Sequence, residues 1–132
     1  MPSPDNKPYA AVFLDEASQL KLVEWWEVAL AIPLLPIRYA HHMTIKYDPS
    51  EMDILEVEIG LLTSMRVVGY ASDACGQAVL VQPQVQCYNK YPHITVATAP
   101  EVGPVYSNEL LEKTFRRVVG PRLMGIVDIR ID

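Results

Sequence analysis

The sequence predicts an α+β domain built on antiparallel β-sheets. Strand-like apolar runs and two helical segments follow one another in the order strand, helix, strand, hairpin, strand, helix, strand. Half of the 132 residues are hydrophobic, which is enough for one buried core and excludes disorder for most of the chain. We expect a flexible N-terminus over residues 1–8, which holds three prolines, and a single domain over residues 9–132.

The first predicted elements are a strand and a helix. Residues 9–14 are apolar enough for a strand that is buried on both faces. Asp15 or Ser18 can cap a helix that runs to about residue 31. This helix carries a wide apolar stripe made of Leu20, Leu22, Val23, Trp25, Trp26, Ala29 and Leu30. Such a stripe favours core packing of the two tryptophans over the alternative that they stack on nucleobases.

The middle of the chain alternates strands with turns. Prolines at positions 33 and 36 end the helix and lead into a strand at residues 41–45. After a turn at 48–50, Ser50 and Asp53 can cap a single helical turn. Residues 61–71 and 77–82 are predicted to form a hairpin around the turn at 72–76.

The last third begins with a looser segment, residues 83–91, and a second short strand at 92–96. An irregular loop follows, and Ser107 or Asn108 then caps a predicted helix that ends near residue 117. The chain closes with a strand over residues 123–131. Each half pairs a helix with a short histidine-containing strand, which indicates an internal pseudo-repeat.

These two strands carry the same motif, His-x-Thr. Because side chains alternate along a strand, His42 and Thr44 point to one face while the apolar residues between and after them point to the other. The same alternation places His93 and Thr95 on one face. His41 is predicted to face away from His42 and to be structural. Each strand therefore packs one face and presents an imidazole beside a hydroxyl.

Two histidines that face one reacting group can divide acid and base work near neutral pH, and threonine hydroxyls can donate hydrogen bonds to its oxygens. The sequence does not assign acid and base to particular histidines. One alternative is a non-catalytic module that binds a nucleotide or protein through the same histidines. A metal-dependent hydrolase is disfavoured, because no ligand spacing is present and adjacent strand residues cannot both face one ion.

The doubled motif resembles the 2H phosphoesterase superfamily. Residues 10–15 (Ala-Ala-Val-Phe-Leu-Asp), 66–71 (Arg-Val-Val-Gly-Tyr-Ala) and 104–108 (Pro-Val-Tyr-Ser-Asn) are also similar to an RNA-repair-associated subgroup, so the resemblance covers residue 9 to the end. It implies two lobes around a central cleft, with catalytic residues His42, His93, Thr44 and Thr95. It also implies a phosphodiesterase for RNA 2′,3′-cyclic phosphate ends or small 2′–5′ or cyclic oligonucleotides, without a metal or other cofactor.

The net charge of −5 argues against a broad nucleic-acid surface, so we expect a small nucleotide or RNA-end substrate and no extended double-stranded nucleic acid. Substrate contacts are expected from Lys46, Tyr88, Lys90 and Ser107. The candidates for a local cationic cluster are Arg38, Lys46, Arg66, Lys90, Arg116, Arg117 and Arg122. Without a membrane span or signal pattern, and with two cysteines in no recognisable framework, we expect a cytoplasmic monomer.

Overall fold

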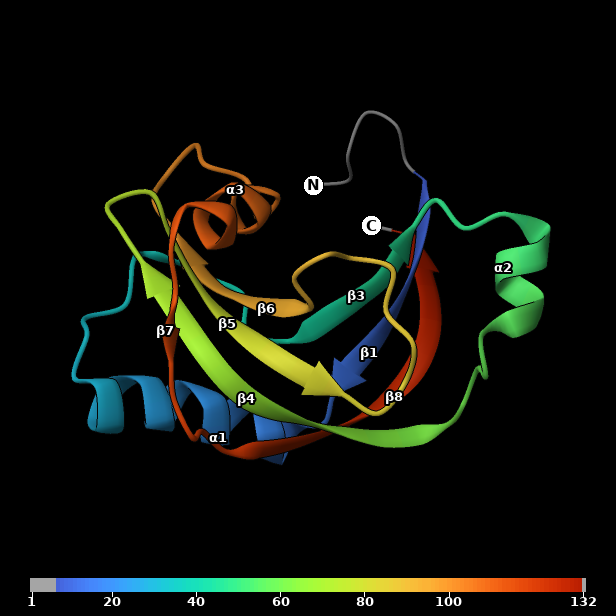
Figure 1. The fold of residues 1–132 in the computed structure, drawn as a ribbon, viewed down its shortest axis with the longest axis horizontal. Coiled ribbons are helices and arrows are strands. Elements are labelled where there is room, and N and C mark those ends of the chain that lie inside the picture. The colour runs from blue at the N-terminus through green and yellow to red at the C-terminus, as the bar shows by residue number, and fades with distance from the viewer. Residues whose placement is uncertain (1–6, 132) are drawn as a thin grey trace.

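The computed structural model describes residues 7–131, in which eight strands form one sheet that closes on itself (Figure 1). The strands are β1 (Pro8–Leu14), β2 (Ile37–Arg38), β3 (His42–Tyr47), β4 (Leu62–Ser72), β5 (Gly76–Pro83), β6 (His93–Thr98), β7 (Arg116–Arg117) and β8 (Arg122–Ile131). The order around the ring is β6-β3-β1-β8-β4-β5, and pairing of β5 with β6 completes it. Short β2 extends from β6, and short β7 extends from β4.

Three helical segments accompany the sheet. The first is α1 (Glu16–Trp25), which begins where the Asp15 carboxylate accepts a 2.7 Å hydrogen bond from the Ser18 N–H. It continues as the π-helical turn η1 (Trp26–Leu30) and ends in the left-handed conformation of Ala31. The second, α2 (Glu51–Glu56), and the third, α3 (Tyr106–Lys113), lie on different sides of the sheet (Figure 1).

Apolar side chains form one large cluster and two smaller ones. The large cluster joins β1, β3, β4, β6 and β8 to Leu22 and Trp26 of the α1–η1 segment. A second cluster packs Leu110 and Leu111 of α3 against β5. A third, formed by Tyr9, Ala11 and Phe13, lies on the other face of β1 from the large cluster. The prediction that residues 9–14 are buried on both faces is confirmed.

The α+β class and the antiparallel pairing are confirmed, but the expected two-lobed arrangement is not. The predicted hairpin exists as β4 and β5, but it is not a separate sheet. Residues 62–66 of β4 pair with β8, whereas the later part of β4 pairs with β5 and β7. One long strand therefore joins both halves of the chain in a single closed sheet.

Several element boundaries differ from the sequence predictions. The expected flexible segment 1–8 falls mostly on residues outside the described ones, and Pro8 already belongs to β1. The last helix ends at Lys113 instead of near residue 117, because Arg116 and Arg117 pair with β4. The capping box of Ser50 and Asp53 is confirmed, although α2 is longer than one turn.

The stripe predicted for the first helix is partly wrong. Leu20 is 66% exposed, whereas Leu22 and Trp26 are fully buried. Leu22 and Trp26, four residues apart, therefore lie on the buried face of the helix, and Leu20 lies outside this face. Trp26 packs edge-on against Tyr70 at 6.0 Å between ring centroids, so it is a core residue and cannot stack on a nucleobase. None of the described helices is long and apolar enough to span a membrane.

Candidate active site

The two His-x-Thr motifs lie side by side because β3 pairs with β6 at Met43 and Ile94. Both of these side chains are fully buried in the large core cluster. Directly paired residues point to the same face of a sheet, so their neighbours in sequence point to the opposite face. That face carries the four residues that we call the tetrad: His42, Thr44, His93 and Thr95. Diagonal neighbours across such a pair are typically about 7–8 Å apart, close enough to contact one phosphate group together.

The surroundings of His93 favour its neutral imidazole form. Its side chain is buried, and Nδ1 donates a 2.7 Å hydrogen bond to the carbonyl oxygen of Tyr91. Burial lowers the pKa of His93 below its ordinary value of 6.5, and the bond to Tyr91 offsets only part of this effect. Because the proton stays on Nδ1, Nε2 carries a lone pair that can accept a proton.

His42 lies in an aromatic environment. Its ring stacks on His41 at 4.6 Å between centroids, with the two Nδ1 atoms 2.6 Å apart. Only one proton can lie between these nitrogens, so one imidazole donates and the other accepts. Tyr9 and Phe13 contact the His42 ring at 5.3 and 5.6 Å between centroids. These contacts fix the orientation of the His42 imidazole.

The prediction that His41 faces away from His42 is wrong. Strand β3 begins at His42, and Ala40 has a φ of 56°, in the left-handed region. The alternation of strand side chains therefore does not extend back to His41. No pattern in the sequence marked this turn, because Ala40 is neither glycine nor asparagine.

Thr95 connects the tetrad to the N-terminal end of α3. Its hydroxyl donates to the carbonyl oxygen of Pro104 at 3.2 Å and lies 2.7 Å from the hydroxyl of Ser107. Ser107 is almost fully buried, so it contacts Thr95 rather than solvent. The prediction that Ser107 or Asn108 caps the helix is wrong, because the N-cap is Val105 and has no side-chain bond. The N–H groups of Ser107 and Asn108 donate instead to carbonyls three residues earlier.

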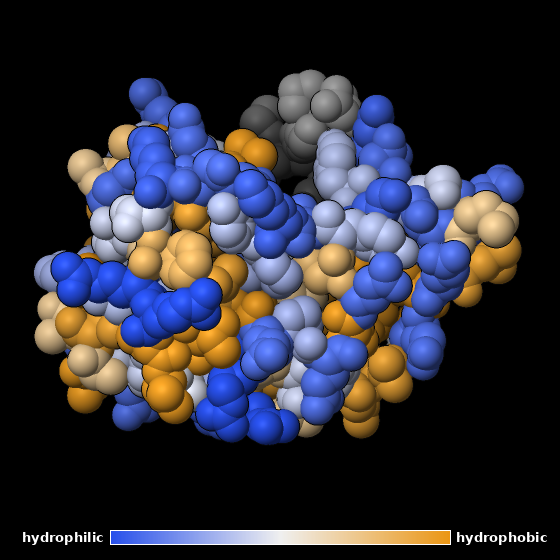
Figure 2. Space-filling view, viewed as in Figure 1, coloured by the Kyte–Doolittle hydropathy of each residue, from blue (hydrophilic) through white to orange (hydrophobic). Residues whose placement is uncertain are grey.

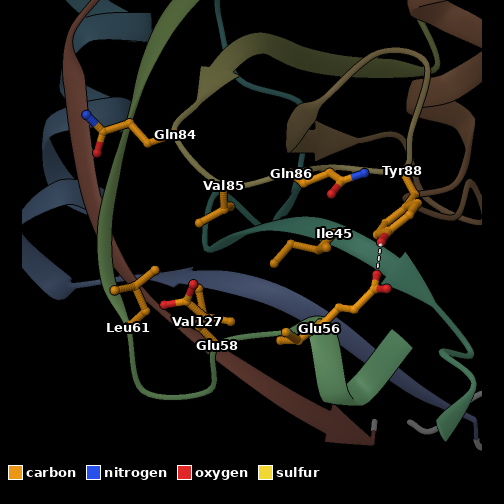
Figure 3. Close-up of a pocket in the computed structure, with 10 residues that line it drawn as sticks. Ile45, Glu56, Glu58, Leu61, Gln84, Val85, Gln86, Tyr88 and Val127 are labelled. Carbon is orange, nitrogen blue, oxygen red and sulfur yellow. Dashed lines mark hydrogen bonds between the residues drawn. The ribbon is translucent and has the colours of Figure 1, made fainter. Parts of the chain in front are cut away.

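Lys46 and Tyr88, two of the predicted substrate contacts, bond to the α2 region. Lys46 Nζ forms an ion pair with Asp53 at 2.9 Å and lies over the Tyr88 ring at 4.9 Å from its centroid. The hydrogen bond with Asp53 is the main cause that raises the pKa of Lys46. Tyr88 donates its hydroxyl proton to Glu56 at 3.1 Å, as Figure 3 shows. The structure thus gives both residues partners of their own.

Lys90, another predicted contact, forms an exposed ion pair with Glu112 of α3 at 3.4 Å. It also lies over the ring of Tyr91, whose carbonyl holds His93. Lys90 therefore links the segment before β6 to α3. A direct contact of Lys46, Tyr88 or Lys90 with substrate stays a prediction.

Neither of two pockets in the described residues is lined by the tetrad, so the expected central cleft is not confirmed. One pocket, of about 290 Å³, lies between α2 and the strands and is drawn in Figure 3. It is lined by Ile45, Glu56, Val57, Glu58, Leu61, Gln84, Val85, Gln86, Tyr88 and Val127. The other, of about 270 Å³, lies on β4, β5 and β8. Within residues 7–131, no group of three or more His, Cys, Asp or Glu side chains is arranged to hold a metal ion.

The comparison with protein families identifies the family of the chain. The model of the fungal tRNA ligase phosphodiesterase domain matches residues 44–131, more than half of the chain. The chain belongs to this family. The fungal tRNA ligase phosphodiesterase domain is a 2H phosphoesterase domain, so the resemblance to that superfamily is confirmed. Membership supports a phosphodiesterase of RNA processing.

The matched region of this phosphodiesterase domain contains the whole second motif and begins at Thr44, two residues after His42. The inclusion of His42 in the tetrad therefore depends on its position in the structure and not on the family match. No curated protein and no solved structure matches the chain.

Proposed function

We propose that this protein is a metal-independent phosphodiesterase that uses His42 and His93 as an acid–base pair. Its substrates are RNA 2′,3′-cyclic phosphate ends or small 2′–5′ or cyclic oligonucleotides. The observation that carries the proposal is the pairing of Met43 with Ile94, which gives both motifs one face of the sheet. Family membership supports the reaction class.

The environment of each histidine supports a division of roles. His93 is buried and keeps its proton on Nδ1, so Nε2 can take a proton from the attacking water. The water oxygen forms a bond to phosphorus as a phosphorus–oxygen bond to the ribose breaks. His42, as imidazolium, then donates its proton to the departing ribose oxygen. The overall charge and proton count balance, because one histidine gains the proton that the other loses.

The threonines face the phosphate in this scheme. Negative charge grows on the non-bridging oxygens in the transition state, and a hydroxyl donor there stabilises it. In the structure Thr95 donates to Pro104 across 3.2 Å, a longer bond than most O–H···O bonds. If the Thr95 hydroxyl rotates toward a phosphate oxygen, it therefore loses only the weak hydrogen bond to Pro104. Ser107 can donate to the Thr95 oxygen throughout and hold it in place.

A panel of substrates tests the proposal directly. Purified protein in excess chelator should hydrolyse at least one of three substrates: a nucleoside 2′,3′-cyclic phosphate, a 2′–5′ oligoadenylate and a cyclic dinucleotide. We expect the rate to be the same with and without the chelator, because the tetrad supplies both the proton transfers and the anion contacts. Activity that chelator abolishes and a divalent ion restores would contradict the proposal.

The contact between Thr95 and Ser107 gives a second expectation. Thr95→Val removes the donor and should lower kcat about 10- to 100-fold, at or below the lower end of the loss typical of an oxyanion-hole donor. Ser107→Ala should lower kcat less and leave KM nearly unchanged, since Ser107 is a positioning residue that acts through Thr95. Ser107→Thr keeps the hydroxyl and should restore activity. Equal losses in both Ser107 variants would indicate a purely structural role.

A further inference from the structure

Two arginines face each other on neighbouring strands at a distance from the tetrad. Arg66 of β4 is paired directly with Arg122 of β8, and on its other side with Gln82 of β5. All three side chains are exposed. Paired residues share one face of a sheet, so these three form a polar row across three strands. Figure 2 shows strongly hydrophilic side chains in the region where β4 and β8 lie side by side.

This row lines a pocket of about 270 Å³ whose side chains offer hydrogen-bond donors. The lining residues are Ser64, Met65, Arg66, Gln82, Pro83, Gln84 and Arg122. The lining includes no carboxylate, although acidic residues outnumber basic ones in the chain. Among the described residues no ion pair involves Arg66 or Arg122. Arg66 instead donates to the carbonyl oxygen of Gly120 at 3.4 Å, and its side chain lines the pocket.

A bound anion would stabilise this arrangement. Like charges placed directly opposite on neighbouring strands repel each other, and here no carboxylate lines the pocket to offset the repulsion. Lys21 adds a further positive charge, because its Nζ donates to the carbonyl oxygen of Arg122 at 3.2 Å. Guanidinium groups bind phosphate through two parallel hydrogen bonds, and this makes arginine the preferred residue for phosphate recognition.

The pocket lies on the same face of the sheet as His93. Leu80 of β5 is paired with His93, and Gln82 lies two residues further along β5. Arg66 lies two strands away from His93 and two residues further along the strand direction. These offsets correspond to a distance of roughly 12 Å between the two residues. A single RNA strand with its end at the tetrad can therefore continue along this face to the arginines.

We propose that Arg66 and Arg122 form a second phosphate site, which binds a backbone phosphate of single-stranded RNA upstream of the reacting end. The proposal rests on the proposed function, since it assumes that the tetrad binds the RNA end. The substrate class is then an RNA strand of several nucleotides, and a mononucleotide uses only the tetrad. Because the chain is acidic overall, a site that binds only one or two phosphates is more consistent with its charge than a broad basic surface.

The test compares two substrates in the variants Arg66→Gln, Arg122→Gln and the double variant. The substrates are cytidine 2′,3′-cyclic phosphate and a single-stranded RNA of about ten nucleotides with a 2′,3′-cyclic phosphate end. We expect the double variant to raise KM for the RNA roughly 10- to 100-fold and to leave KM for the mononucleotide unchanged. The slope of log affinity against log salt should fall by about 0.7 per lost phosphate contact. Lys113→Gln, which removes one positive charge from the exposed end of α3, is the control.

The experiment distinguishes failure of the second phosphate site from failure of the proposed function. If the double variant and Lys113→Gln give the same KM for the RNA, the second phosphate site is wrong even though the enzyme is active. If the wild type cleaves neither substrate, the proposed function fails, and fluorescence anisotropy with the same RNA then tests the site alone. In that case, loss of RNA affinity in the double variant only would support the site, and unchanged affinity would overturn it.

Discussion

Alanine at either tetrad histidine should lower turnover by roughly 10²–10⁴-fold, the usual contribution of a positioned acid or base. His93→Ala removes the Nε2 lone pair that takes the proton, and His42→Ala removes the proton for the leaving oxygen. KM should change far less than kcat, because proton transfer contributes only in the transition state. The double variant should lose little more than the worse single one, since the two histidines act as a unit. Steady-state kinetics on variants with wild-type circular dichroism measures these effects.

His41→Phe provides the matched control for this experiment. It keeps a ring against His42 but removes the bond between the two Nδ1 atoms. We expect a smaller loss than for His42→Ala, because the proton donor itself remains. A non-catalytic binding module would behave differently: alanine at either tetrad histidine would weaken ligand binding, and there would be no turnover to lose. Undiminished turnover in both histidine variants would contradict the assignment.

Trp26→Ala should destabilise the protein by about 3–5 kcal/mol, the typical cost of removing a large buried aromatic side chain. Trp26 is fully buried and joins the α1–η1 segment to the large core cluster. Its indole Nε1 is buried and has no hydrogen-bond partner among the described residues. Trp26→Phe removes that unsatisfied donor together with part of the ring, so it should cost much less. Urea unfolding of the two variants makes the comparison, and equal losses would show that packing of an aromatic ring at this position does not determine the stability.

Local alternation in the sequence was sufficient to place the tetrad on the correct faces of its strands. His42 and Thr44 alternate with core residues in β3, as His93 and Thr95 do in β6. The pairing of these two strands could not be predicted from the pattern, because residues 43 and 94 are far apart in the chain. The closure of the sheet escaped prediction for the same reason, since it depends on β4 pairing with both β5 and β8.

Side-chain partners were the least predictable part of the site. Lys46 was correctly expected on the histidine strand, but its ion pair with Asp53 of the neighbouring helix was not foreseen. The residue type of Ser107 suggests a helix cap, whereas its hydroxyl bonds to Thr95, twelve residues earlier. In both cases a contact between two different secondary-structure elements determines the role of the side chain. A period of two or 3.6 residues carries no information about such contacts.

The dependence of rate on pH tests the division of acid and base work most directly. His93 must be neutral to accept a proton, and burial lowers its pKa below 6.5. The wild-type kcat/KM should therefore rise with pH through an apparent pKa below 6.5, and it should fall again at higher pH as the acid, His42, loses its proton. In His93→Ala the rising limb should disappear, and in His42→Ala the falling limb should disappear. A rising limb that persists unchanged in His93→Ala would contradict the assignment of His93 as the base.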